Sequence, residues 1–148
     1  MYINRIPIIM SALLTVLVVG SPIAANDPHL NATTVLRLND TTVNSTLALY
    51  PFFILDFYET GCEPCQRMNA TLSELARELN GQAAFGTIDA EKSNVTAKIY
   101  NITSYPTLLI FENGTLVDSS LGFGSKTRIV NKLKRWKPEL DTSNKYPI

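Results

Sequence analysis

The chain has 148 residues, enough for one domain with a full hydrophobic core and too few for two ordinary domains. Lysine and arginine together number 13, as do aspartate and glutamate, so the formal net charge is zero. A chain without a basic excess is not expected to take nucleic acid as its main partner, because phosphate contacts need cationic side chains.

The first 25 residues have the composition of a targeting segment. Arg5 precedes an apolar run over 6–19, and small residues follow as far as Ala25. This order is typical of a secretory signal peptide cleaved after Ala25. The alternative is an uncleaved anchor, because residues 6–25 are about long enough to span a bilayer and would tether the protein to a membrane. Both interpretations predict an extracytoplasmic protein, either secreted or anchored on the outer side of the membrane.

Acceptor sites for asparagine glycosylation are unusually frequent. Asn-x-Thr occurs seven times, where the composition predicts about two. The sites are Asn31, Asn39, Asn44, Asn69, Asn94, Asn101 and Asn113. Exported chains carry N-linked sugars on this pattern, so the enrichment agrees with export and predicts a glycoprotein. Asn113-Gly114 is also a natural hairpin turn.

Strand and helix patterns alternate along residues 33–137, between a polar linker over 26–32 and a polar tail over 138–148. The run Phe52–Tyr58 is apolar and aromatic with one acid inside, which is typical of a strand buried on both faces. The expected order is strand 33–38, a short helix capped by 39–42 and ending near 49, strand 52–58, helix 62–79, strand 83–88, helix 91–100, strand 107–111, strand 116–120 and helix 125–137.

This order predicts an α/β domain. The early alternation of strands and helices requires crossovers and parallel pairing, and the late hairpin adds antiparallel strands. We therefore expect one central mixed sheet of four to five strands, flanked by helices on both faces.

The helix expected over 62–79 begins with Cys62 and Cys65, the only cysteines in the chain. A disulfide that closes so short a loop stabilises a fold by only about 2 kcal/mol in the chain-entropy model. A helix N-terminus does favour a thiolate, because its free N–H groups and partial positive charge stabilise an anion. Pro64 suits the first turn of a helix and restrains the backbone between the sulfurs. The pattern predicts reversible redox chemistry.

Four local motifs stand in order along the chain. They are Ile54-Leu55-Asp56-Phe57 followed by Cys62-x-x-Cys65, then Thr87-Ile88-Asp89, then Tyr105-Pro106-Thr107-Leu108, then Phe111-Glu112-Asn113-Gly114 with Gly122 beyond it. Together, and at matching spacings, they resemble the thioredoxin family over residues 33–137. The resemblance implies a thioredoxin fold and a thiol–disulfide oxidoreductase, which the first 25 residues and the acceptor sites predict to be exported.

The resemblance also implies a role for each site residue. Cys62 would be the exposed nucleophile, and Cys65 the buried partner that closes the Cys62–Cys65 disulfide. Asp56 would handle the proton of Cys65. Pro106 would be cis and would present the backbone of Tyr105 to an extended substrate. The expected protein is a monomer without a cofactor, acting on protein disulfides or thiols with a redox partner protein as electron donor or acceptor.

Several positions depart from the cytoplasmic thioredoxin pattern, and they are Tyr58, Gly61, Glu63, Ala70, Phe85 and Tyr105. The carboxylate of Glu63 beside Cys62 disfavours the thiolate, which predicts a more reducing pair. Glu63 is equally a favourable charge in the first helical turn. The sequence leaves the direction of electron flow open.

Other functions remain as alternatives. One is a binding module in which the disulfide is static. Another is a copper(I) carrier that uses the two thiolates and Met68. No resident metal is expected, because covalent haem attachment needs a histidine where Gln66 stands, and zinc would have two cysteines and the lone His29. The basic run Lys132, Lys134, Arg135 and Lys137 predicts a solvated end of the last helix.

Overall fold

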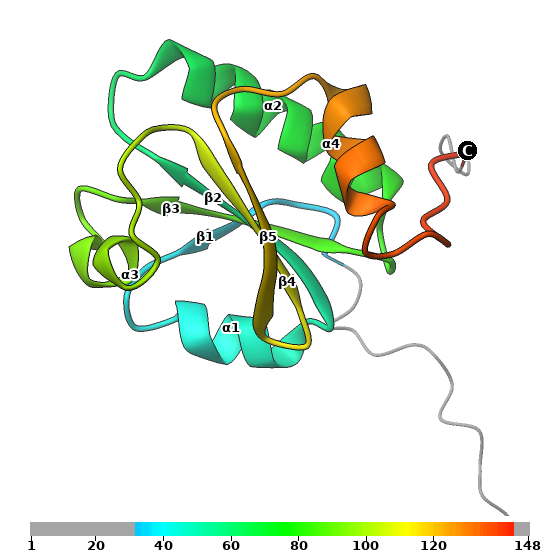
Figure 1. Cartoon of the computed structure of the whole chain (residues 1–148), viewed down its shortest axis with the longest axis horizontal. Coiled ribbons are helices and arrows are strands. Elements are labelled where there is room, and N and C mark those ends of the chain that lie inside the picture. The colour runs from blue at the N-terminus through cyan, green and yellow to red at the C-terminus, as the bar shows by residue number, and fades with distance from the viewer. Residues whose placement is uncertain (1–31, 144–148) are drawn as a thin grey trace, which may run out of the picture.

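The computed structural model describes residues 32–143 (Figure 1). The predicted targeting segment, most of the linker and the acceptor Asn31 lie outside the described residues, as do residues 144–148. None of the helices within residues 32–143 has the length and hydropathy needed to cross a membrane.

The described chain contains five strands and four helices in the predicted order. They are β1 (Leu36–Leu38), α1 (Val43–Leu49), β2 (Phe52–Tyr58), α2 (Glu63–Glu78), β3 (Ala84–Asp89), α3 (Asn94–Ile99), β4 (Thr107–Glu112), β5 (Thr115–Leu121) and α4 (Lys126–Leu133). Asn113 and Gly114 join β4 to β5 with φ angles of 49° and 76°, as a two-residue hairpin turn requires.

Three elements are shorter than predicted by three residues or more. β1 begins at Leu36 because its pairing with β3 covers only residues 36–38. α3 begins at Asn94 because the carboxylate of Asp89 accepts hydrogen bonds from the backbone N–H groups of Glu91 and Lys92 and holds a turn there. α4 ends at Leu133, and the residues up to 136 form a turn before Pro138.

The sheet is mixed, with the strand order β1-β3-β2-β4-β5. β1, β3 and β2 run parallel, whereas β4 and β5 are antiparallel to their neighbours. The expected mixed α/β sheet is therefore confirmed, with five strands. β2 is central, and its residues 52–57 are all buried, which agrees with its continuous apolar sequence.

Helices cover both faces of the sheet (Figure 1). On one face α2 and α4 pack over side chains that include Ile54, Phe85 and Ile110. On the other face α1 and α3 pack over side chains that include Phe53 and Phe111. Residues of β2 alternate between these layers, as strand geometry requires, so Asp56 shares the α2 face with Ile54.

The capping of α1 differs from the prediction. Thr42 is its N-cap residue but makes no side-chain capping bond. Asn39 instead holds the preceding turn by accepting from the backbone N–H groups of Thr41 and Thr42. Asp40 caps α3, accepting from the backbone N–H of Thr96 at 2.8 Å and from its hydroxyl at 2.6 Å.

The basic end of α4 is only partly solvated. Asp118 on β5 forms ion pairs with Lys132 at 2.8 Å and Arg135 at 2.9 Å, and it accepts a hydrogen bond from the indole N–H of Trp136 at 3.1 Å. Burial acts to raise the pKa of Asp118, but the hydrogen bonds from Lys132 and Trp136 outweigh it and lower the pKa to about 2. The predicted solvated face is thus wrong for Lys132, whose side chain is only 18% exposed, whereas Arg135 binds Asp118 and is still 63% exposed.

Candidate active site

Cys62 and Cys65 form a disulfide at the N-terminus of α2, with their α-carbons 5.2 Å apart. Cys62 is the N-cap residue and is half-buried, whereas Cys65 is only 4% exposed. The backbone N–H of Cys65 donates a hydrogen bond to Sγ of Cys62 at 3.2 Å. The outer sulfur therefore stands in the field of the helix terminus, which stabilises a thiolate there once the pair is reduced.

The turn before the cysteines depends on Gly61. Its φ of 80° lies in the left-handed region that disfavours residues with a Cβ. Glycine at this position therefore suits the backbone geometry of the turn.

Asp56 lies on β2 and is fully buried. Neither of its carboxylate oxygens has a hydrogen-bond partner among the described residues. Burial raises its pKa to about 8, because the charged form is disfavoured away from water. Phe85, where the family often has lysine, is also fully buried and pairs with Ile54 in the register.

The Tyr105-Pro106 peptide bond is cis, as the resemblance implied. Thr107, the next residue, pairs with Phe57 near the C-terminal end of β2. The cis bond therefore lies at the same end of the sheet as the turn that leads from β2 to Cys62. The carbonyl of Pro106 accepts a hydrogen bond from the backbone N–H of Gly122 at 2.8 Å. The side chain of Tyr105 packs against the α1/α3 layer and is half-buried.

The first turns of α2 also contact the loop after β5. Glu63 and Arg67 form a long ion pair of 4.0 Å, and the guanidinium of Arg67 lies 5.1 Å from the centre of the Phe123 ring. Both charged side chains are largely exposed. Sequence reasoning missed Arg67 and Phe123. The spacing of four residues between Glu63 and Arg67 could have revealed the ion pair, but nothing local pointed to Phe123.

A cleft of about 260 Å³ lies against the disulfide. Its walls include both cysteines, Arg37, Asn69 and Thr87. This cleft was not predicted, because it forms where α2 passes over β1 and β3.

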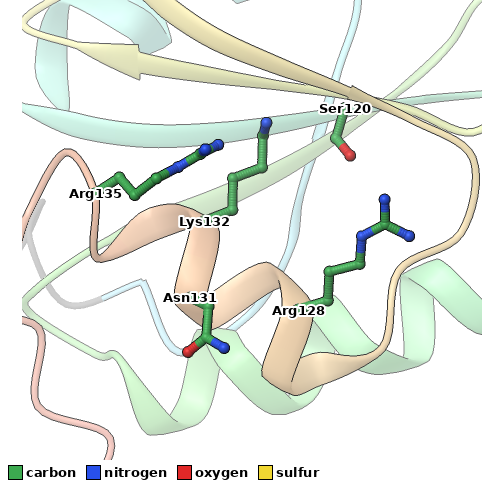
Figure 2. Close-up of a pocket in the computed structure, with 5 residues that line it drawn as sticks. All are labelled: Ser120, Arg128, Asn131, Lys132 and Arg135. Carbon is green, nitrogen blue, oxygen red and sulfur yellow. The ribbon is translucent and has the colours of Figure 1, made fainter.

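A larger hollow of about 360 Å³ lies between α4 and β5, away from the cysteines. Figure 2 shows Arg128 and Lys132 extending from α4 toward the side where β5 carries Ser120, while Asn131 points away. Lys132 and Arg135 are bound to Asp118, so this surface is less cationic than its composition suggests. Within residues 32–143, no three His, Cys, Asp or Glu side chains gather as a metal site.

Residues 34–135 match the family model of thioredoxin. The chain belongs to the thioredoxin family. Thioredoxin of Staphylococcus aureus is 34% identical to it over 82 residues, which cover 55% of this chain and 79% of that protein.

Two solved thioredoxins have the same fold. A thioredoxin variant from Halobacterium salinarum has a TM-score of 0.68 at 22% identity, over 72% of this chain and 93% of that one. The oxidised thioredoxin from Plasmodium falciparum has a TM-score of 0.63 at 23% identity, over 70% of this chain and 98% of its own. The predicted thioredoxin fold is confirmed, and with the Cys62–Cys65 pair the chain is a thiol–disulfide oxidoreductase of this family.

Proposed function

We propose that the protein is an extracytoplasmic thioredoxin that reduces disulfides in other proteins. The observation that carries the proposal is the asymmetry of the pair, in which Cys62 is accessible at the helix terminus and Cys65 is buried behind it. A static disulfide in a binding module would not need one accessible sulfur held under a backbone N–H group.

The reduction proceeds in two exchanges. In the reduced protein, the thiolate of Cys62 attacks one sulfur of the substrate disulfide, and the other substrate sulfur leaves as a thiolate. Cys65 then loses its proton and attacks Sγ of Cys62. The Cys62–Cys65 disulfide forms, and the second substrate thiolate leaves. The substrate gains two electrons and the pair loses two, which a redox partner protein restores. Oxidation of a substrate follows the same steps in reverse.

Asp56 is the base in this proposal. A carboxyl group whose pKa is about 8 holds or releases a proton near neutral pH, which suits proton exchange with a thiol of similar pKa. Its position on the α2 face of β2, below the helix that carries Cys65, supports this assignment.

The substrate site lies around Pro106 and the accessible sulfur of Cys62. An extended substrate segment would pair with the backbone of Tyr105 as an added strand, with Pro106 fixed by its hydrogen bond from Gly122. Leu121 and Phe123, which are 67% and 37% exposed, supply apolar surface beside this bond. This apolar surface fits an unfolded or extended protein substrate better than a small polar disulfide.

Glu63 and Arg67 tune the pair. The carboxylate of Glu63 raises the free energy of a thiolate at Cys62, which favours a reducing enzyme. The positive charge of Arg67 lowers the free energy of the same thiolate. Because Arg67 and Glu63 form an ion pair, their combined effect on the thiolate is moderate.

The pattern over residues 6–25 and the seven acceptor sites support an extracytoplasmic, glycosylated protein, either secreted or tethered through residues 6–25. The six described acceptors, Asn39, Asn44, Asn69, Asn94, Asn101 and Asn113, are all exposed. Exposure is what a sugar on a folded domain requires, so each of these sites is compatible with modification.

Reduction of insulin disulfides tests the activity. The wild-type protein, supplied with dithiothreitol, is expected to accelerate insulin precipitation, and Cys62→Ser is expected to abolish this. Cys65→Ser should also be inactive and should trap a mixed disulfide that a non-reducing gel resolves. Full activity of either variant would refute the enzyme mechanism.

Expression of the full chain in a eukaryotic secretory system tests the location. Treatment with peptide-N-glycosidase is expected to increase the mobility of the protein recovered from the medium or from the membrane surface. A variant with all seven asparagines changed to glutamine is the matched control. Recovery of unmodified protein from the cytosol alone would contradict the proposed location.

A further inference from the structure

The cleft beside the disulfide opens on the β3 side of β2, whereas Pro106 lies on the β4 side. A second hollow of about 260 Å³ shares Arg37, Asn69 and Thr87 with it and continues beside α2 to Arg77. Solvent therefore reaches Thr87 from the side of β2 away from Pro106, and the second hollow does so without contacting the cysteines.

Thr87 is also the lateral neighbour of Asp56. The register pairs Asp56 with Thr87 on β3 and with Leu108 on β4. Neighbouring strands lie about 4.8 Å apart and their paired side chains share a face, so the hydroxyl of Thr87 stands within reach of the carboxyl group through one bridging water. Of the two register partners of Asp56, only Thr87 has a polar side chain.

The polar atoms of this pair need hydrogen bonds. Oγ1 of Thr87 and both carboxylate oxygens of Asp56 are buried without a partner among the described residues. Such groups are costly unless a buried water satisfies them. Thr87 lines the cleft and is 6% exposed, whereas Asp56 is fully enclosed. Of these two residues, Thr87 is thus the one whose side chain contacts the solvent in the cleft.

We propose that Thr87 is a positioning residue for proton transfer, and that its hydroxyl connects Asp56 to solvent in the cleft. The inference rests on the role of Asp56 in the proposed function. Cys65 gives its proton to the Asp56 carboxylate, and the protonated acid later passes a proton through bridging water and the Thr87 hydroxyl to solvent. The hydroxyl accepts one proton and donates another, so it ends unchanged, and no electrons pass through it.

The charged groups near this route lie at the mouth of the cleft. Lys92 is paired with Asp89 at 2.9 Å, and Arg37 and Glu59 line the rim. The elements packed around Asp56 present uncharged side chains. Its register partner on β4 is Leu108, and the buried residues of α2 begin with Cys65 and Met68. Burial alone raises the pKa of Asp56, so removal of a neighbouring hydroxyl acts on Asp56 without a competing ion pair.

The test uses Thr87→Val, which keeps the shape and the strand preference but removes the hydroxyl, and Thr87→Ser, which keeps the hydroxyl. The reduced protein is mixed with Ellman's reagent, and stopped-flow absorbance separates attack by Cys62 from the later displacement by Cys65, between about pH 5 and pH 10. We expect Thr87→Val to slow the displacement about tenfold at pH 7. We also expect it to raise the midpoint of the pH profile of the displacement rate by about one pH unit. Thr87→Ser should follow the wild type.

Two outcomes would overturn the proposal. One is a Thr87→Val profile that superimposes on the wild type. The other is an equal loss in Thr87→Ser, which would assign the effect to packing. Denaturant unfolding of each variant verifies that the fold is intact.

Asp56→Asn separates this inference from the proposed function. If Asp56 is the base, Asp56→Asn removes the rise of the displacement rate with pH. Thr87→Val then causes no further change in that background. A wild-type profile in Asp56→Asn would refute Asp56 as the base. The link to Thr87 is then decided by infrared titration of the Asp56 carboxyl group: a higher pKa in Thr87→Val supports it, and an unchanged pKa overturns it.

Discussion

The ring of Phe53 packs against the α-carbon of Gly86 in the neighbouring strand. A Cβ added at Gly86 would lie 2.6 Å from Cζ of Phe53 and 3.2 Å from Cδ1 of Leu38. Phe53 is fully buried, so its ring has no free space into which it can move. Glycine weakens a strand, and here the close approach of an aromatic ring explains why one stands in β3.

Gly86→Ala is expected to destabilise the fold by about 1–3 kcal/mol, because the extra methyl group overpacks the core. Urea unfolding measures the change. Phe53→Leu removes the ring atoms that clash, so the cost of Gly86→Ala should be smaller in the Phe53→Leu background. Strict additivity of the two changes would contradict the assigned contact.

Gly61→Ala isolates a different cost of adding a methyl group. An added Cβ at Gly61 meets nothing within 4 Å, but the φ of 80° is strained for alanine. The expected loss is about 1 kcal/mol. Gly61→Asn is the control, because asparagine tolerates the left-handed region and should cost less. Equal losses in the two variants would argue against a backbone origin.

Asp56→Asn is expected to stabilise the oxidised protein at neutral and higher pH. The folded pKa of Asp56 is about 8, above the ordinary value of 3.8 that the unfolded chain has. The folded state therefore holds the proton more tightly, and the wild type loses stability as pH rises from about 4 to about 8, by at most about 1.4 kcal/mol per pH unit. Unfolding free energies of both proteins should agree near pH 4 and diverge toward pH 8. A constant difference across this range would contradict the burial effect.

Glu63→Gln and Arg67→Gln should move the reduction potential of the cysteine pair in opposite directions. Removing the carboxylate of Glu63 stabilises the thiolate and raises the potential, whereas removing the guanidinium of Arg67 lowers it. Each shift is expected to be about 10–30 mV, because both side chains are largely exposed. Equilibration with glutathione measures the potentials. Shifts of the same sign would show that charge at this turn does not tune the pair.

Asp118→Asn should weaken the attachment of the end of α4 to β5. The pKa of Asp118 is about 2, below its ordinary value of 3.8, so its stabilising contribution is complete above about pH 4 and is lost as pH falls toward 2. Solvent reaches this carboxylate, and we expect a loss of only about 1 kcal/mol at pH 7. The difference from the wild type should vanish near pH 2. Its persistence there would point to packing by Trp136.

The sequence could predict those parts of the fold that local pattern determines. The apolar run of β2 predicted its bounds, residues 52–58, and the helix expected over 62–79 is α2, which is one residue shorter at each end. The cysteines were apparent because no others exist in the chain.

The remaining features depend on contacts between distant segments. Asp40 caps α3 by accepting from Thr96, which lies 56 positions further along the chain. Asp118 binds Lys132 near the end of α4 and two residues beyond this helix, Arg135 and Trp136. The position of Thr87 beside both Asp56 and the cleft follows from the strand register, which no local pattern gives. Phe123 meets Arg67 only because β5 ends next to α2.

The acceptor asparagines are unevenly distributed over the molecule. Of the six that are described, five accompany α1, α3 or the neighbouring β4–β5 turn, and only Asn69 belongs to α2. Sugars on those five sites would shield one broad side of the domain from proteases and from contact with other macromolecules. A sugar on Asn69, which lines the cleft with Cys62, would instead stand next to the disulfide and restrict the direction from which a partner docks.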